Sequence, residues 1–387
     1  MVDLTSLTSL EIKRISRLVC LPQSFIKSLI VVQNVEIEEC LQLTCLWDEG
    51  AEIENLACLE EMEIKGCPLL VSLTGKEQGL LPFNLKCLTI SNCAALESLL
   101  DAMMMKLDGS SSGNNMSRLE SLIIDNCDSL KSLPTTSVKH LIIDKCANFE
   151  SLPDGVLLQD DGDSNSTLEC LRIKELPSLN SVGSGHLPAS LKEFVVYDCK
   201  RWESFLKRIL QHCIGLESID IWNCEVLRSF SLDGLSNLRA LKIRKCAVLE
   251  FFPEMGLSLP NLGLLGIEDC PRFERIPDGG LPLNLTDLEL EDCQNLNSLP
   301  NTMNGLTSIK KLKIKDCLGI KSIPDGGFPP NLTNLELDGE HLKQPVVKRG
   351  LRNLTSLEVL HIYDTCPLLD IVLLSSLVDL RISNARI

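Results

Sequence analysis

A single repeating pattern of apolar residues runs through the chain and constrains its fold more than any other feature. In residues 285–300 it reads L-x-x-L-x-L-x-x-C-x-x-L-x-x-L-P. The same pattern fits residues 119–134 and 262–277, and about sixteen copies follow one another along the 387 residues. Its ninth position is a cysteine in most copies, and Cys224, Cys246 and Cys270 follow one another at steps of 22 and 24 residues. Self-similarity at this period is typical of solenoids rather than of globular domains.

The spacing within one copy predicts a strand followed by a return segment. Leu288 and Leu290 are two residues apart, and residues two apart share one face of a strand, so we expect both in the interior. The leucines three and six residues after the cysteine return to the same interior. Because a single coil cannot bury its apolar face alone, neighbouring coils must stack. We therefore expect an α/β solenoid, a leucine-rich-repeat horseshoe with a parallel β-sheet on its concave face and irregular or short helical segments on its convex face.

The repeats continue without a linker, so we expect one domain over residues 1–387. Two steps between repeats are long, and their surplus residues are polar and rich in Gly, Ser and Asp, which predicts surface loops near 101–117 and 158–167. The net charge of −16 disfavours nucleic acid as a partner. No apolar run reaches the about 18 residues of a membrane span, and no signal peptide is visible, so we expect a cytoplasmic protein.

The cysteines at the ninth position of the repeat are expected to be reduced and structural. Zinc sites use paired ligands such as C-x-x-C, and this chain has none. One cysteine per coil is better explained as a small buried side chain whose thiol reaches backbone carbonyls left free by the turn. The sequence therefore predicts no metal and no cofactor. The structural cysteines are Cys40, Cys67, Cys93, Cys127, Cys146, Cys199, Cys224, Cys246, Cys270, Cys293 and Cys317.

The outward positions of the strands carry the candidate binding residues. Tyr197 and Trp222 occupy equivalent outward positions in successive repeats, so we expect them to be neighbours on the sheet, where exposed aromatic residues often dominate binding. They could instead stack on each other without a ligand. Charged residues form bands of alternating sign, the first of them acidic and spanning residues 36–39 and 60–63. Such bands either pair across neighbouring strands or complement a partner. The candidate partner-binding residues are Tyr197, Trp222, Arg239, Lys242, Arg244, Glu268, Glu289, Glu291, Lys313, Lys315, His361 and Tyr363.

Catalytic patterns are missing from the sequence. The five histidines lie in no H-E-x-x-H motif, and no serine or cysteine stands in a nucleophile elbow. The sequence therefore predicts a binding protein without catalytic residues.

Several local phrases resemble a known family. They are the C-x-x-L-x-S-L-P runs, the G-L-P-x-N-L connector of residues 280–285, and the segments 43–50 (L-T-C-L-W-D-E-G) and 350–357 (G-L-R-N-L-T-S-L). The chain resembles the repeat region of plant intracellular disease-resistance proteins of the coiled-coil nucleotide-binding leucine-rich-repeat (NBS-LRR) class. This resemblance implies a recognition scaffold in the defence response. Its partner would be a pathogen effector, a guarded host protein, or a nucleotide-binding module that the repeats hold inactive.

The chain departs from that family in one respect, and other classes of protein use similar repeats. It has no G-x-x-x-x-G-K-[ST] phosphate loop, so we expect no nucleotide-binding domain in it and interpret it as a fragment or a truncated relative. A substrate receptor of a ubiquitin ligase would usually continue after the cysteine with a helix. A plant ectodomain would show an N-x-L-x-G-x-I-P pattern. A stand-alone leucine-rich-repeat interaction protein is a further alternative.

Overall fold

The computed structural model divides into two compact units, Met1–Leu191 and Lys192–Ile387, which we call the first and the second unit and describe separately. The prediction of a single domain stays a prediction. The structure describes residues 4, 6–47, 53–74, 81–99, 118–134, 137–152, 156, 166–179, 186–198, 210, 213–225, 227–229, 232, 234–254, 256–321, 323–324, 326–338, 351, 353–363 and 375–383. The predicted loops near 101–117 and 158–167 lie almost entirely outside these residues.

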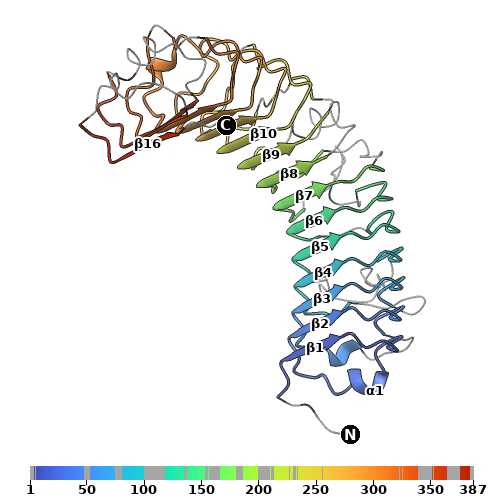
Figure 1. The fold of residues 1–387 in the computed structure, drawn as a ribbon. Helices are drawn as coiled ribbons and strands as arrows, with labels where there is room; N and C mark the ends of the chain where they lie inside the picture. Colours follow the sequence, from blue (N-terminus) through green and yellow to red (C-terminus); the bar gives the residue numbers. More distant parts are fainter. Residues whose placement is uncertain are drawn as a thin grey trace. The chain divides into compact units, whose positions relative to one another are not determined.

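The described residues of the first unit form seven short parallel strands that pair in the order of the sequence. In Figure 1 they lie side by side along one side of the coils, and the return segments run along the other side. The strands are β1 (Ser9–Lys13), β2 (Asn34–Glu38), β3 (Glu61–Lys65), β4 (Cys87–Ser91), β5 (Ser121–Asp125), β6 (His140–Asp144) and β7 (Cys170–Lys174).

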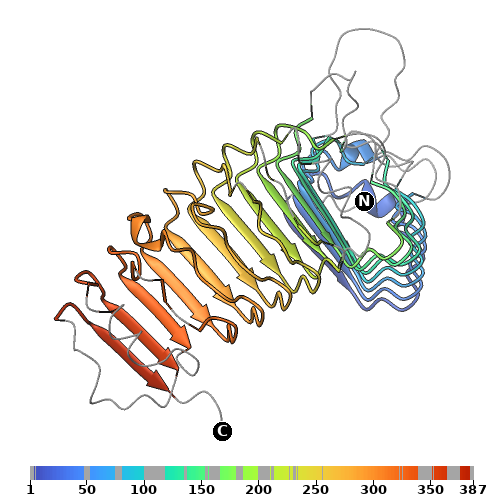
Figure 2. The same cartoon turned by 90° about the horizontal axis from the view of Figure 1, so that it is seen from above.

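The second unit repeats this arrangement with nine strands in its described part, again parallel and paired in sequence order. Figure 2 shows these strands lying side by side and pointing the same way. They are β8 (Glu193–Tyr197), β9 (Ser218–Trp222), β10 (Ala240–Arg244), β11 (Leu264–Glu268), β12 (Asp287–Glu291), β13 (Lys311–Lys315), β14 (Asn334–Asp338), β15 (Val359–Tyr363) and β16 (Asp379–Ser383).

Most strands have one buried face and one face open to solvent, as alternation in a strand requires. In β12, Leu288 and Leu290 are fully buried, whereas the first, third and fifth residues are partly exposed. The same alternation holds in β2, β9, β10 and β13. The spacing of the repeat is therefore confirmed as the pattern that builds the core. We call the outward residues at positions one, three and five the strand face.

The return segments are mostly irregular. The helices among the described residues are short: α1 (Gln23–Ile26), η1 (Ile53–Asn55) and η2 (Met303–Gly305). Single β-bridges join neighbouring return segments, and in the second unit they link residues 229, 251, 275 and 298 in one row. Each unit is thus a leucine-rich-repeat solenoid with parallel strands and few helices, which confirms the predicted fold class. Within the described part of the chain, no helix has the length and apolar character to cross a membrane.

A left-handed residue ends most strands. Among the described residues, twelve other than glycine have positive φ, and each directly follows the fifth residue of a strand; Gly66 takes the same place after β3 with φ 62°. Asp269 is an example: at φ 50° its amide donates to the Glu291 carbonyl of the following coil over 2.8 Å. Asn and Asp tolerate this conformation better than other side chains. In most of the described coils the turn therefore connects one coil to the next through a backbone hydrogen bond.

The structural cysteines lie directly after these turns, at the ninth position of the repeat. All those that the structure describes are buried, and Cys199 lies outside the described residues. The thiol of Cys293 donates to the Glu291 carbonyl over 3.4 Å and faces the Ile267 carbonyl of the preceding coil at 3.6 Å. Cys270 and Cys317 make the same pair of contacts. Each of these thiols thus supplies a weak hydrogen-bond donor to the backbone carbonyls beside the turn. Among the described residues, no group of three or more potential metal ligands occurs.

Candidate protein-binding surface

Tyr197 and Trp222 lie next to each other on the strand face of the second unit. Each is the fifth residue of its strand, and the register pairs the two residues directly. Their ring centroids are 5.9 Å apart and their planes are tilted by 44°. Both side chains are half-buried rather than fully exposed, because each ring covers part of the other. The sequence predicted this neighbourhood, and it also left open the alternative that the two rings stack on each other, which the ring contact matches.

Cations lie over the Trp222 ring. Register places Arg244 of β10 beside Trp222, and its guanidinium carbon is 5.3 Å from the ring centroid. Lys245, in the left-handed position after β10, places its ammonium nitrogen 4.8 Å from the same ring. A cation within about 6 Å of an aromatic face is attracted to the ring. Trp222 is therefore held between Tyr197 and two positive charges.

Asp220 of β9 connects this aromatic pair to the charged rows. Arg244 donates to an Asp220 carboxylate oxygen at 3.2 Å and lies 3.8 Å from Glu268. The Tyr197 hydroxyl also donates to the Asp220 carboxylate. Burial raises the pKa of Asp220, and the positive charge of Arg244 offsets part of that increase. We call Tyr197, Asp220, Trp222 and Arg244 the aromatic cluster.

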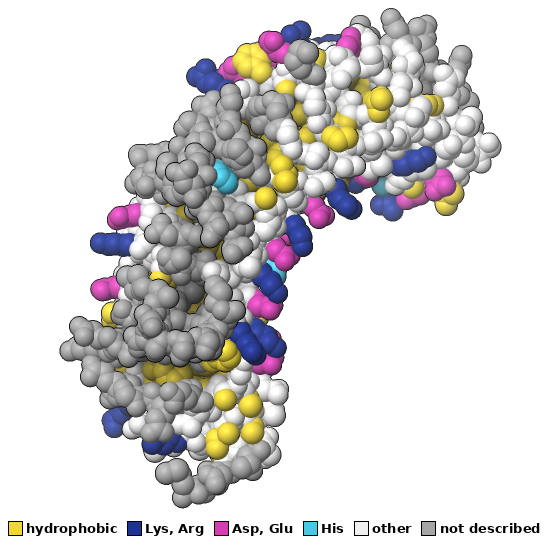
Figure 3. Space-filling model, turned by 180° about the vertical axis from the view of Figure 1, so that it is seen from behind, with side chains coloured by type: hydrophobic (Ala, Val, Ile, Leu, Met, Phe, Trp, Pro, Cys, Tyr) yellow, Lys and Arg dark blue, Asp and Glu magenta, His cyan; other side chains and the backbone are white. Residues whose placement is uncertain are grey.

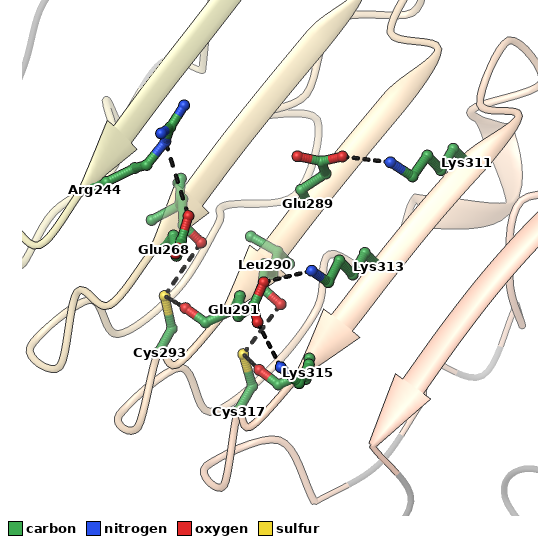
Figure 4. Close-up of polar contacts among 11 residues, drawn as sticks. Arg244, Glu268, Glu289, Leu290, Glu291, Cys293, Lys311, Lys313, Lys315 and Cys317 are labelled. Atoms are coloured by element: carbon green, nitrogen blue, oxygen red, sulfur yellow. Dashed lines mark hydrogen bonds and ion pairs between the residues drawn. The ribbon is translucent and has the colours of Figure 1, made fainter. Parts of the chain in front are cut away.

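Further along the same face, carboxylates and lysines pair across strands (Figure 4). Lys311 is 2.6 Å from a Glu289 oxygen, and Glu291 receives Lys313 at 2.5 Å and Lys315 at 2.8 Å. Partial burial acts to raise the pKa of Glu291, but the hydrogen bonds from both lysines hold it below its ordinary value. The bands of opposite sign in β12 and β13 are thus paired with each other, which is the structural alternative that the sequence left open.

The acidic band of the first unit is also partly neutralised. Lys13 of β1 forms ion pairs with Glu11, Glu36 and Glu38, and Lys65 of β3 lies 2.7 Å from Glu63. The acidic band predicted from the sequence did not include these two lysines. They stand at the fifth strand position, so reading positions three and five in every repeat would have found them. In both units acidic and basic side chains are interspersed along the strand face (Figure 3).

The remaining candidates are spread along the second unit. Arg239 is exposed just before β10, with its guanidinium 3.7 Å from Glu217. His361 of β15 is half-buried, and its imidazole lies 3.6 Å from Asp379. Tyr363 ends β15, and its side chain lies outside the described part. The structure therefore brings Tyr197, Trp222 and Arg244 into one cluster and leaves His361 and Tyr363 away from it, on a strand five places further along the sheet.

Two features of the aromatic cluster's surroundings were missed in the sequence. Asp220 was not a candidate, although it lies between the buried Ile219 and Ile221 at an outward position. Gly266 is the third residue of β11 and contributes no side chain to the strand face. A Cβ built on it would lie 3.5 Å from Lys242 Cγ and 3.9 Å from a Glu289 carboxylate oxygen. Lys242 and Glu289 therefore flank a bare stretch of backbone beside the cluster.

Comparisons with known proteins find structures with leucine-rich repeats and no family. No protein-family model and no curated protein matches the chain. Among solved structures, the leucine-rich-repeat domain of the type III effector XopL is 19% identical, with 82% of this chain and 71% of that one covered and a TM-score of 0.25. TLR13 in its complex with ssRNA13 is 15% identical, with 98% and 64% covered and a TM-score of 0.42. Toll in the Drosophila Toll–Spatzle complex is 12% identical, with 98% and 55% covered and a TM-score of 0.41. The chain thus spans less than two thirds of the last two, and the leucine-rich-repeat assignment rests on its own coils.

Proposed function

We propose that this chain is a protein-recognition scaffold without catalytic activity, which binds a partner protein through the aromatic cluster on the strand face of its second unit. The observation that carries the proposal is the half-buried Tyr197–Trp222 pair with Arg244 over the indole. Large aromatic residues and arginine are the side chains that most often dominate protein interfaces. The cluster is fixed by stacking and by Asp220, so a partner would meet a surface that is already ordered.

We further propose that this recognition serves plant immunity. The phrases in residues 43–50, 280–285 and 350–357 support it through their resemblance to disease-resistance repeat regions. In that role the partner is a pathogen effector, a guarded host protein or a nucleotide-binding module. A cytoplasmic location agrees with the sixteen described cysteines, all of which are free thiols, since extracellular proteins tend to oxidise theirs.

The test uses the wild-type chain and two variants, Trp222→Ala and Phe83→Ala, as bait in plant leaf extract. The captured proteins are quantified by mass spectrometry. Trp222→Ala removes the centre of the cluster. Phe83→Ala is the matched control, because the Phe83 ring also lies under a cation, Arg118 at 4.9 Å, but it is exposed in a return segment. We expect the specific partner to be depleted about 10-fold or more with Trp222→Ala and to be retained with Phe83→Ala. Equal capture by all three forms would contradict the proposed surface.

The class of captured protein tests the finer role. A nucleotide-binding receptor module or a pathogen effector expressed in the leaf would support the immune assignment. Recovery of ubiquitin-ligase adaptors, lost with Trp222→Ala, would favour the substrate-receptor alternative while leaving the recognition surface intact.

A further inference from the structure

One lysine on the strand face of the second unit lacks the ion pair that its neighbours make. Arg244 pairs with Asp220 and Glu268, Lys311 with Glu289, Lys313 and Lys315 with Glu291, and Arg381 with Asp379. Lys242, the third residue of β10, has no ion-pair partner among the residues that the structure describes. It is half-buried on the face between the aromatic cluster and Gly266.

The two carboxylates nearest to Lys242 in its row are already bound to other cations. Asp220, directly opposite on β9, receives Arg244 and Tyr197. Glu289, on the far side of Gly266, receives Lys311 at 2.6 Å. Lys242 thus feels both charges only at longer range. Because Gly266 has no side chain, nothing on β11 at that position stands between the lysine and an approaching partner.

A second lysine without an ion pair in the described part of the chain lies over the indole. Lys245 is exposed, its ammonium is 4.8 Å from the Trp222 centroid, and it has no carboxylate partner in the described part of the chain. Lys242 and Lys245 are therefore two positive charges without an ion pair in the described part of the chain, in a protein whose net charge is −16. Charges without an internal partner are the ones available for electrostatic complementarity at an interface.

We propose that the partner segment bound at the aromatic cluster is an acidic peptide segment of a protein. One carboxylate would lie on Lys242, a second on Lys245, and an apolar side chain between them on Trp222. The inference rests on the proposed function and specifies the chemistry of its partner. A peptide fits better than a nucleic acid, because Glu268, Glu289 and Glu291 nearby would repel the continuous charge of a phosphate backbone, whereas separated carboxylates meet only the two lysines.

The experiment selects binders from a phage-displayed library of random 12-residue peptides on the purified full chain. We expect retained peptides to be enriched in Asp and Glu near an apolar residue. Selection on Lys242→Gln/Lys245→Gln should lose the acidic enrichment and keep the apolar one. The matched control is Lys310→Gln/Lys321→Gln, which neutralises two other exposed lysines without ion pairs among the described residues, and it should select the same acidic peptides as the wild-type chain.

The affinity of the most enriched peptide is then measured by fluorescence anisotropy. Each lysine substitution should weaken binding about 2- to 5-fold, the effect expected for a partly exposed charge pair, and salt should reduce that difference. Peptides that need Trp222 but show no acidic enrichment would overturn this inference and leave the proposed function standing. Peptides indifferent to Trp222→Ala would count against the proposed function itself. Tighter, Lys242-dependent binding of a 12-residue oligothymidylate would show a nucleic-acid site and overturn the inference.

Discussion

The backbone amide of Asp269 donates to the carbonyl oxygen of Glu291 in the following coil over 2.8 Å. The same oxygen accepts the thiol of Cys293 at 3.4 Å, so both of its acceptor positions are used. This carbonyl is where a left-handed turn, a strand end and a buried cysteine meet. Removing any of these three groups should therefore lower the free energy of unfolding.

Cys293→Ala should lower the free energy of unfolding by about 1–3 kcal/mol, since it removes a buried sulfur and a hydrogen-bond donor. Urea denaturation followed by circular dichroism measures the change. Cys58→Ala is the matched control, because Cys58 is exposed, and it should change stability by less than about 0.5 kcal/mol. Equal effects of the two substitutions would mean that the cysteine at the ninth position contributes little to packing.

Two glycines should respond in opposite directions to alanine. At Gly319 a Cβ would lie 2.5 Å from the Leu296 carbonyl oxygen, a backbone atom that cannot move away easily, so Gly319→Ala should cost about 1–3 kcal/mol. At Gly266 the nearest atoms are at ordinary contact distance, and Gly266→Ala should be neutral or stabilise by about 0.4–1 kcal/mol through the unfolded state. Thermal unfolding of both variants tests the contrast, which a destabilised Gly266→Ala would contradict.

Stability should fall at alkaline pH because of buried thiols in the first unit. Burial raises the pKa of Cys127 to about 11 and that of Cys146 to about 12, from an ordinary value of 9.0. The folded state therefore keeps its thiol protons where the unfolded chain loses them. The stabilisation is complete below pH 9 and is lost as pH rises toward 11–12, with up to about 1.4 kcal/mol per pH unit for each thiol.

Denaturation curves at pH 8, 9 and 10 measure this slope. Cys127→Ala lowers stability at every pH, but it should also flatten the alkaline slope by removing one titrating thiol. If the variant and the wild-type chain lost stability with the same slope, the thiols would not be the groups responsible.

Glu291→Gln should destabilise the chain by about 1 kcal/mol or less at low salt, because the side chain is 17% exposed and its partners Lys313 and Lys315 remain hydrated. The pKa of Glu291 in the folded chain lies below its ordinary value. The stabilisation by this carboxylate is therefore fully present above the ordinary pKa and is lost as pH falls through the lower pKa of the folded state. Glu274→Gln, at an exposed carboxylate without an ion pair in the described residues, is the control. The difference between the two variants should shrink in 1 M NaCl, and a difference insensitive to salt would argue against an electrostatic origin.

Much of the fold follows from the spacing of apolar residues, because periodicity alone decides which side chains enter the core. Leu288, Leu290 and Cys293 are buried where the repeat predicts. The left-handed turn was not foreseen, since its position also holds Arg14 and Lys145, which carry no glycine-like signal. The inward strand positions hold apolar residues at the same spacing in successive copies, so the sequence reveals them. The left-handed position holds several residue types, so no single residue marks the turn.

The sequence predicted which residues of the candidate site are neighbours, but it did not predict their side-chain contacts. Equivalent positions in successive repeats placed Tyr197 beside Trp222. The cover of Trp222 by Arg244 and Lys245 was not predictable, because it depends on how flexible side chains settle across strands. The same limit applies to Lys13, whose pairing with three glutamates is visible only once the side chains are placed.

The hydrogen bond that most left-handed residues donate to the next coil has a consequence for how such a chain can change length. Asp269 and Asp292 occupy equivalent places, and their amides reach the carbonyls of Glu291 and Lys315. Removing residues 270–292 would set Asp269 where Asp292 stood, with its donor directed at the Lys315 oxygen. Recombination between neighbouring repeats in a gene could therefore delete or duplicate whole turns and rearrange the strand face while every junction kept its bond.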